Sequence, residues 1–171
     1  MFVVRCFCYR TTNKNGEPFV TFSGYFQSSS LLGAVMNGKK NIAIGFLTMG
    51  FFMAYGFLLI YLRDFAPGKE EWAANYSSGK HFETRLAHVH GNLFAFLNIV
   101  IGYLLLHFQT KLSNTQAISW LALAGLLMPL GILSEVYFGL PPVLVLVGAM
   151  TMTASVMWLG VAFFRMKGDM P

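Results

Sequence analysis

The chain has 171 residues, of which 56% are hydrophobic and only 11% are charged, and its mean hydropathy is +0.57. A soluble domain carries about 25% charged residues, so this composition excludes an ordinary soluble domain. The net charge is +5, but no basic cluster stands beside base-stacking aromatic residues, which argues against a nucleic-acid partner. The sequence therefore predicts an integral membrane protein whose main partner is the lipid bilayer.

The N-terminal stretch differs from the rest of the chain. Residues 1–35 are rich in Ser, Thr and Phe and have no clear helical period. The run Met36-Asn37-Gly38-Lys39-Lys40 has the form of a native bacterial membrane-protein start, because a short basic leader directly precedes an apolar segment. We expect residues 1–35 to be a flexible tail or a translation-start artefact, and residues 36–171 to form the transmembrane domain.

Four apolar segments are long enough to cross a bilayer, which requires about 20 mostly apolar residues. They cover residues 42–62, 86–108, 118–138 and 143–164. Residues 63–85 form the only long connection, and the other two connections are short, so neighbouring helices must be antiparallel. The predicted fold is all-α: an integral membrane four-helix bundle with antiparallel neighbours.

Basic residues on the two sides of the predicted bundle indicate its orientation. One side holds Lys39, Lys40, Lys111, Arg165 and Lys167 together with the basic residues of the N-terminal stretch, and the other holds Arg63, Lys69, Lys80 and Arg85. Cytoplasmic loops are enriched in Lys and Arg. We therefore expect cytoplasmic termini, in a bacterial inner membrane.

Two histidines open the second apolar segment. In regular helix, His88 and His90 are separated by a turn of about 200°, so the two rings face nearly opposite sides and cannot both bind one metal ion. His88 shares its face with Asn92, whereas His90 shares its face, less closely, with Asn98. One ring is expected to face the bundle, and the other the loop or a neighbouring subunit.

Depth brings further polar residues to the same level. The second segment starts on the outer side and the third ends there, so His90, Glu135 and Tyr137 fall in one leaflet. Tyr55 of the first segment reaches a similar level. Ionisable residues inside a membrane are costly, so this group predicts a polar pocket open toward the outer face.

Imidazole is the commonest protein ligand of heme iron, and an apolar helical bundle suits a porphyrin. We expect His88 or His90 to ligate iron, Gly91 and Gly102 to leave room for the flat ring, and Glu135 to orient the ligand. Alternatively, the histidines only bond loop carbonyls and Glu135 lies near the headgroups. His81 is expected to be a solvated loop residue.

Two families resemble parts of the chain. The segment Ala87-His88-Val89-His90-Gly91-Asn92-Leu93 resembles the Ala-His-x-His-x-x-Leu pattern of short four-helix proteins related to the heme-copper oxidase catalytic subunit. The loop Pro67-Gly68-Lys69-Glu70-Glu71-Trp72-Ala73, followed by Ser78-Gly79, is similar to that of styrene oxide isomerases, small four-helix membrane proteins. The second resemblance extends from the first helix into the second.

The second resemblance implies a homo-oligomer that carries heme b, whose ferric iron acts as a Lewis acid on a small apolar epoxide and yields an aldehyde. By carry-over, His88 or His90 ligates the iron, Asn92 or Asn98 is the polar helper, and Tyr137 stands for the tyrosine of the family. In that family the ligating His closely follows the Trp-Ala pair, where this chain has Tyr76. The alternatives are an electron-transfer protein like the heme-copper oxidases and a non-enzymatic membrane protein whose polar residues stabilise helix packing.

Overall fold

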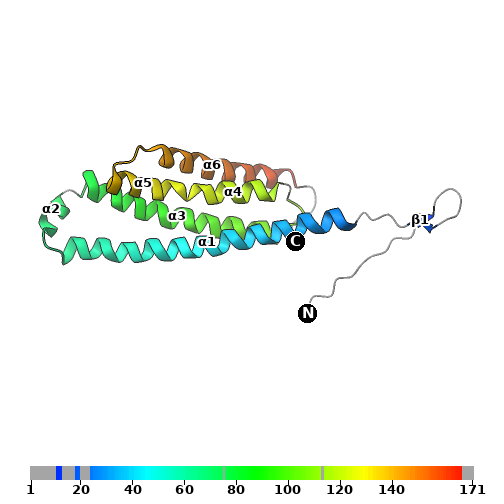
Figure 1. The fold of residues 1–171 in the computed structure, drawn as a ribbon, viewed down its shortest axis with the longest axis horizontal. Coiled ribbons are helices and arrows are strands. Elements are labelled where there is room, and N and C mark those ends of the chain that lie inside the picture. The colour runs from blue at the N-terminus through cyan, green and yellow to red at the C-terminus, as the bar shows by residue number, and fades with distance from the viewer. Residues whose placement is uncertain (1–10, 13–17, 20–23, 75, 113, 167–171) are drawn as a thin grey trace.

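The protein is a bundle of long helices with a short helix at one end, seen here in a computed structural model (Figure 1). The structure describes residues 11–12, 18–19, 24–74, 76–112 and 114–166, with only the backbone described for residues 24–36. The helices are α1 (Gly24–Asp64), α2 (Lys69–Ala74), α3 (Gly79–His107), α4 (Thr115–Gly125), α5 (Leu127–Phe138) and α6 (Val143–Phe164). Before the bundle, β1 (Thr11–Thr12) pairs antiparallel with β2 (Pro18–Phe19).

Within the described residues, four helical stretches are long and apolar enough to cross a membrane. They are Asn37–Asp64, Gly79–His107, Thr115–Phe138 and Val143–Phe164. Their exposed surfaces are apolar, as at Leu47 and Phe57 of α1, which are 75% and 71% exposed. Such surfaces are stable against lipid and not against water. The predicted all-α four-helix membrane fold is confirmed.

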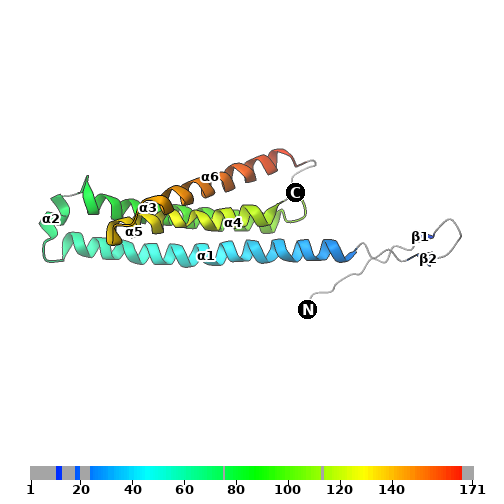
Figure 2. The same ribbon diagram turned by 45° about the horizontal axis from the view of Figure 1, so that its top comes forward.

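The helices are grouped around α3, which packs along α1 and also contacts α4 and α5 (Figures 1 and 2). Helix α4 contacts α1 as well, and α6 covers α4 and α5. Both views show the N-terminal part of α1 extending beyond the other helices. One end of the bundle, which we call the cap end, carries α2 and the start of α3; the opposite end carries the α3–α4 connection and the end of α6.

Two helix starts differ from the expected ones. Helix α1 already begins at Gly24, so part of the stretch expected to be a flexible tail is helical backbone, while residues 1–10, 13–17 and 20–23 lie outside the described residues. No proline interrupts the sequence from Gly24 to Asp64, so the helix can continue upstream of its apolar part. Helix α3 begins at Gly79 and not at residue 86, because its polar first turns extend beyond the apolar segment.

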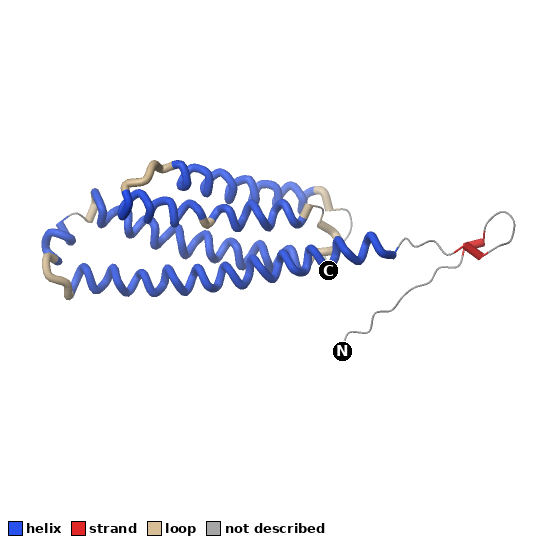
Figure 3. The backbone as a smooth tube through the Cα atoms, viewed as in Figure 1, coloured by secondary structure: helices blue, strands red, loops and turns tan. Residues whose placement is uncertain are grey.

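The third span is two helices and not one. A short break at Leu126 separates α4 from α5 (Figure 3). Pro129 has no backbone N–H to donate to Gly125, and its ring clashes with the carbonyl of a continuous helix there. The backbone N–H of Leu126 instead bonds the carbonyl of Leu123 at 3.1 Å. The break therefore follows from Pro129, whose effect on the helix is not detected by a search for apolar segments.

Three helices meet at a fully buried polar network. Asn41 Nδ2 donates to Asn98 Oδ1 at 3.0 Å and to the carbonyl of Ser119 at 3.2 Å, and Ser119 Oγ donates to Asn41 Oδ1. Asn98 Nδ2 donates to the carbonyl oxygens of Phe94 and Ala122 at 3.0 and 2.9 Å. These bonds tie α1, α3 and α4 together in a setting where lipid offers no alternative partners.

Candidate functional site

The two histidines of the His-x-His pair face different surroundings. His88 points from α3 to α1, where its Nδ1 donates to the carbonyl oxygen of Phe52 at 2.8 Å. His90 Nδ1 donates to the carbonyl oxygen of Leu86 in its own helix at 2.9 Å. The rings therefore do not meet, and only His88 lines the cavity described next.

A cavity of about 440 Å³ lies between α1 and α3 near the cap end. This volume is within the range of about 300–1,000 Å³ that is usual for ligand sites. Its α3 wall is His81, Arg85, His88 and Asn92, which recur at the i, i+4, i+7 and i+11 spacing of one helix face and span about 16 Å. Its α1 wall is formed by Met53, Gly56, Phe57, Leu59, Ile60 and Arg63, and Tyr76 closes the cap end.

Glycine on α1 makes room for the His88 ring. A Cβ at Gly56 would lie 2.6 Å from His88 Cε1, closer than real side-chain contacts allow. Gly56 is therefore the reason that the imidazole fits between the two helices. About one helical turn away the roles of the helices are reversed: Gly91 of α3 leaves space for the Phe52 ring of α1.

This contact overturns one expectation about the glycines. The space at Gly91 is filled by Phe52, and the space at Gly102 is filled by the backbone of Gly38, whose carbonyl oxygen would lie 2.6 Å from an added Cβ. Neither glycine leaves room for a porphyrin. Both instead allow α1 and α3 to approach closely, as small residues do between membrane helices.

The bond to Phe52 sets the tautomer of His88. A carbonyl oxygen only accepts, so Nδ1 carries the proton and Nε2 of the neutral ring keeps its lone pair. Within the described residues Nε2 has no hydrogen-bond partner. A backbone carbonyl that holds the Nδ1 proton is the usual support of a metal-ligating histidine.

His81 is not the solvated loop residue that the sequence predicts. It lies in the first turn of α3 and is only 3% exposed. Its Nδ1 donates to the carbonyl oxygen of Trp72 at 2.7 Å, its ring stacks on the Trp72 indole at 4.7 Å, and the Tyr76 ring meets its edge at 5.3 Å. The loop before α3 folds back over this imidazole, which a linear reading of polar residues does not reveal.

Cationic side chains gather at the cap end of the cavity. Arg85 Nη1 donates to the carbonyl oxygen of Tyr76 at 3.1 Å, and its guanidinium carbon lies 3.7 Å from the centre of the Tyr76 ring. Arg63 forms a bidentate ion pair with Asp64: Nε donates to Oδ1 at 2.9 Å and Nη2 donates to Oδ2 at 2.8 Å. The cavity thus has a mostly apolar wall on α1 and two arginines near the cap end.

Asn92 lies one helical turn from His88, on the same wall of the cavity. Its Nδ2 donates to the carbonyl oxygen of His88 at 2.9 Å and lies 3.5 Å from His88 Nδ1. Asn92 lines the cavity, so its amide is placed to touch a ligand held at His88. Of the two asparagines named from the sequence, this one is at the site.

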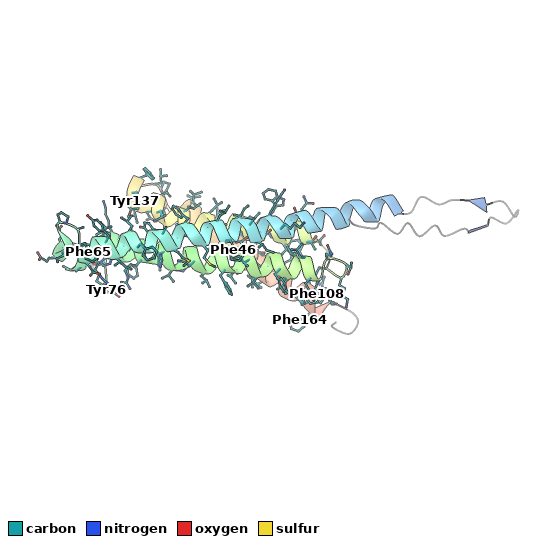
Figure 4. The ribbon with its side chains drawn as sticks, turned by 90° about the horizontal axis from the view of Figure 1, so that it is seen from below. Phe46, Phe65, Tyr76, Phe108, Tyr137 and Phe164 are labelled. Atoms are coloured by element: carbon teal, nitrogen blue, oxygen red, sulfur yellow. The ribbon has the colours of Figure 1, made fainter. Side chains whose placement is uncertain are left out.

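The structure places the remaining candidates elsewhere. Asn98 belongs to the buried network with Asn41 and has no surface on the cavity. Glu135 is exposed on α5 and does not line the cavity. Tyr137 is 53% exposed, and its hydroxyl oxygen lies 3.2 Å from that of Tyr55. Figure 4 shows Tyr137 and Tyr76 at the same end of the bundle but on different sides.

Sequence reasoning missed four polar lining residues: Arg63, Tyr76, His81 and Arg85. For His81 and Arg85 the signal was present, since they form a single polar stripe with His88 and Asn92 at helical spacing. It was hidden because α3 starts before the apolar segment. Within the described residues, no group of three or more His, Cys, Asp or Glu side chains could hold a metal ion.

Comparisons with family models, with curated proteins and with solved structures find no significant match to this chain.

Proposed function

We propose that this membrane protein binds heme b in the cavity between α1 and α3, with His88 as the iron ligand. The observation that carries the proposal is the hydrogen bonding of the His88 ring, which lines the cavity: Nδ1 donates to the Phe52 carbonyl, and Nε2 has no hydrogen-bond partner among the described residues. Heme needs only one or two protein ligands, because the porphyrin supplies the others. The lack of a cluster of three or more metal-binding side chains among the described residues is therefore compatible with heme.

The side chains that line the cavity also support heme as its occupant. Apolar side chains such as Met53, Phe57 and Ile60 line the cavity and suit the apolar face of a porphyrin. His90 makes a bond within its own helix and does not reach the cavity. Among the two histidines left open by the sequence, we therefore propose His88.

The proposed reaction rests on the resemblance to styrene oxide isomerases. When bound, a ferric heme would supply a Lewis acid for an epoxide oxygen. The chain's own residues hold the cofactor through His88, exclude water with the apolar α1 wall, and position a small apolar substrate beside Asn92. Electron transfer is the second candidate, and Lewis-acid isomerisation of an added aryl epoxide by the heme-loaded protein distinguishes the two.

Assembly and orientation belong to the same proposal. Met53 and Phe57 line the cavity and are 57% and 71% exposed, so the cavity opens on the outer surface of the bundle. We propose a homo-oligomer in which a neighbouring copy covers this opening. The distribution of Lys and Arg supports cytoplasmic termini in a bacterial inner membrane.

The test is heme loading of the detergent-purified protein, measured by the Soret absorption band. Wild type should carry heme, His88→Ala should lose it, and the control His90→Ala should keep it, since His90 is outside the cavity. A colourless wild type after growth with ample heme would contradict the proposal. Equal heme content in His88→Ala and wild type would contradict the ligand assignment.

A further inference from the structure

A second cavity lies at the end of the bundle opposite the cap, and its chemistry differs from that of the first. It has a volume of about 310 Å³ and lies between the α3–α4 connection and the last turns of α6. Its polar lining is Lys111, Asn114 and Arg165, and its apolar lining is Trp158, Val161, Ala162 and Met166. We propose that this cavity binds the phosphate group of an acidic phospholipid. This proposal does not depend on heme.

The charges at this cavity favour an anion. Lys111 and Arg165 both line it, and none of its described lining residues is acidic. Among the described residues, the Arg165 guanidinium has no hydrogen-bond or ion-pair partner. By contrast, Arg63 at the cap end is paired with Asp64 and Arg85 is stacked on Tyr76. Arg165 beside the second cavity is therefore a better candidate for a bound anion than Arg63 or Arg85.

The start of α4 adds a second attraction for a phosphate. Asn114 precedes the helix with a positive φ of 57° and makes no side-chain hydrogen bond to its first turn. The first backbone N–H groups of a helix have no partner within the helix, and they attract anions. Because Asn114 also lines the cavity, this end of α4 lies next to the two cations.

The position of the cavity favours a lipid over a free phosphate. The spans end here, at His107 for α3 and at Phe164 for α6, which is 94% exposed. Figure 4 places Phe108 and Phe164 together at this end of the bundle. Exposed apolar residues continue from the cavity along α6, including Val161 (45%) and Met157 (67%). A headgroup phosphate can thus meet the cations while its acyl chains follow α6.

The test is lipid binding by the full-length protein in detergent, measured by native mass spectrometry. The probes are short-chain phosphatidylglycerol, short-chain phosphatidylcholine and inorganic phosphate. We expect wild type to prefer phosphatidylglycerol. Each of Lys111→Gln and Arg165→Gln should weaken that binding about 5-fold, and the double variant about 25-fold, since a cation near a membrane surface contributes about a factor of 5.

Two exposed cations of α1 provide the matched control. Lys39 and Lys40 lie at the same end of the bundle, next to Gly38, which packs on Gly102, but they do not line the cavity. Lys39→Gln with Lys40→Gln should keep the lipid preference. An equal loss in this control, no preference in wild type, or full displacement of the lipid by inorganic phosphate would overturn the proposal.

Discussion

Three imidazoles near the cap end have different surroundings although each donates from Nδ1 to a backbone carbonyl. His90 bonds its own helix, His81 is buried against Trp72, and His88 bridges to the neighbouring helix α1. Only for His88 does the bond cross between two spans and leave the ring beside a cavity with an apolar wall. This is the physical reason to propose His88, and not His81 or His90, as the iron ligand.

The two asparagines of α3 should separate binding from stability. Asn98→Ala removes bonds to Asn41 and to two carbonyl oxygens, and should lower the free energy of unfolding by about 1–2 kcal/mol while heme affinity is kept. Asn92→Ala removes a side chain that lines the cavity, and should lower heme affinity with little effect on unfolding. Reversible unfolding in detergent and heme titration measure the two effects. The opposite pattern would place the functional asparagine in the buried network.

At the scale of the elements, the site depends on how closely α1 approaches α3. Gly56 and Gly91 admit the side chains of His88 and Phe52 into the contact between the two helices. The His88 imidazole is therefore held by packing against α1 as well as by its hydrogen bond to Phe52. A change in the spacing between α1 and α3 should shift the position of this ring.

Adding one methyl group at Gly56 tests this dependence. Gly56→Ala should displace the His88 ring, because the new Cβ would lie 2.6 Å from it, and should lower heme affinity about 10- to 100-fold. Gly50→Ala in the same helix is the control, since nothing lies within 4 Å of its added Cβ. Heme titration of both variants measures the effect. Equal affinities would show that the His88 position is not set by α1.

Much of the helical framework could be predicted from the sequence, because apolar length alone defines a membrane span. The segment 143–164 coincides with α6, and the other spans differ mainly at their ends. The break at Leu126 depends on Pro129, and the start of α3 depends on polar turns that hydropathy does not detect. The partners of His88 and His81 depend on which helices are neighbours, so they required the three-dimensional structure.

At the scale of the whole molecule, the two ends of the bundle differ in chemistry. The cap end holds the α1–α3 cavity, with its arginines engaged by Asp64 and Tyr76. The opposite end holds the cavity beside Lys111 and Arg165. The long membrane spans between them are apolar toward their surroundings.

The proposed orientation rests on the distribution of Lys and Arg, including the basic residues of the N-terminal stretch. A reporter fused after Pro171 should behave as cytoplasmic, and one inserted near Ser77 as external, because Lys and Arg favour the cytoplasmic side. Paired enzymatic and fluorescent reporters at both positions measure the outcome. The reverse pattern would place the cavity between α1 and α3 near the cytoplasmic face and leave its geometry unchanged.

The most direct measurement of the central claim is chemical rescue of the His88 ligand. His88→Gly removes the imidazole and leaves space next to Gly56, so added imidazole can occupy the position of the lost ring. We predict that His88→Gly purified without imidazole lacks the Soret band, and that imidazole restores heme binding and the band, whereas His90→Gly keeps the band throughout. A His88→Gly protein that retains full heme without imidazole would contradict the assignment of His88 as the iron ligand.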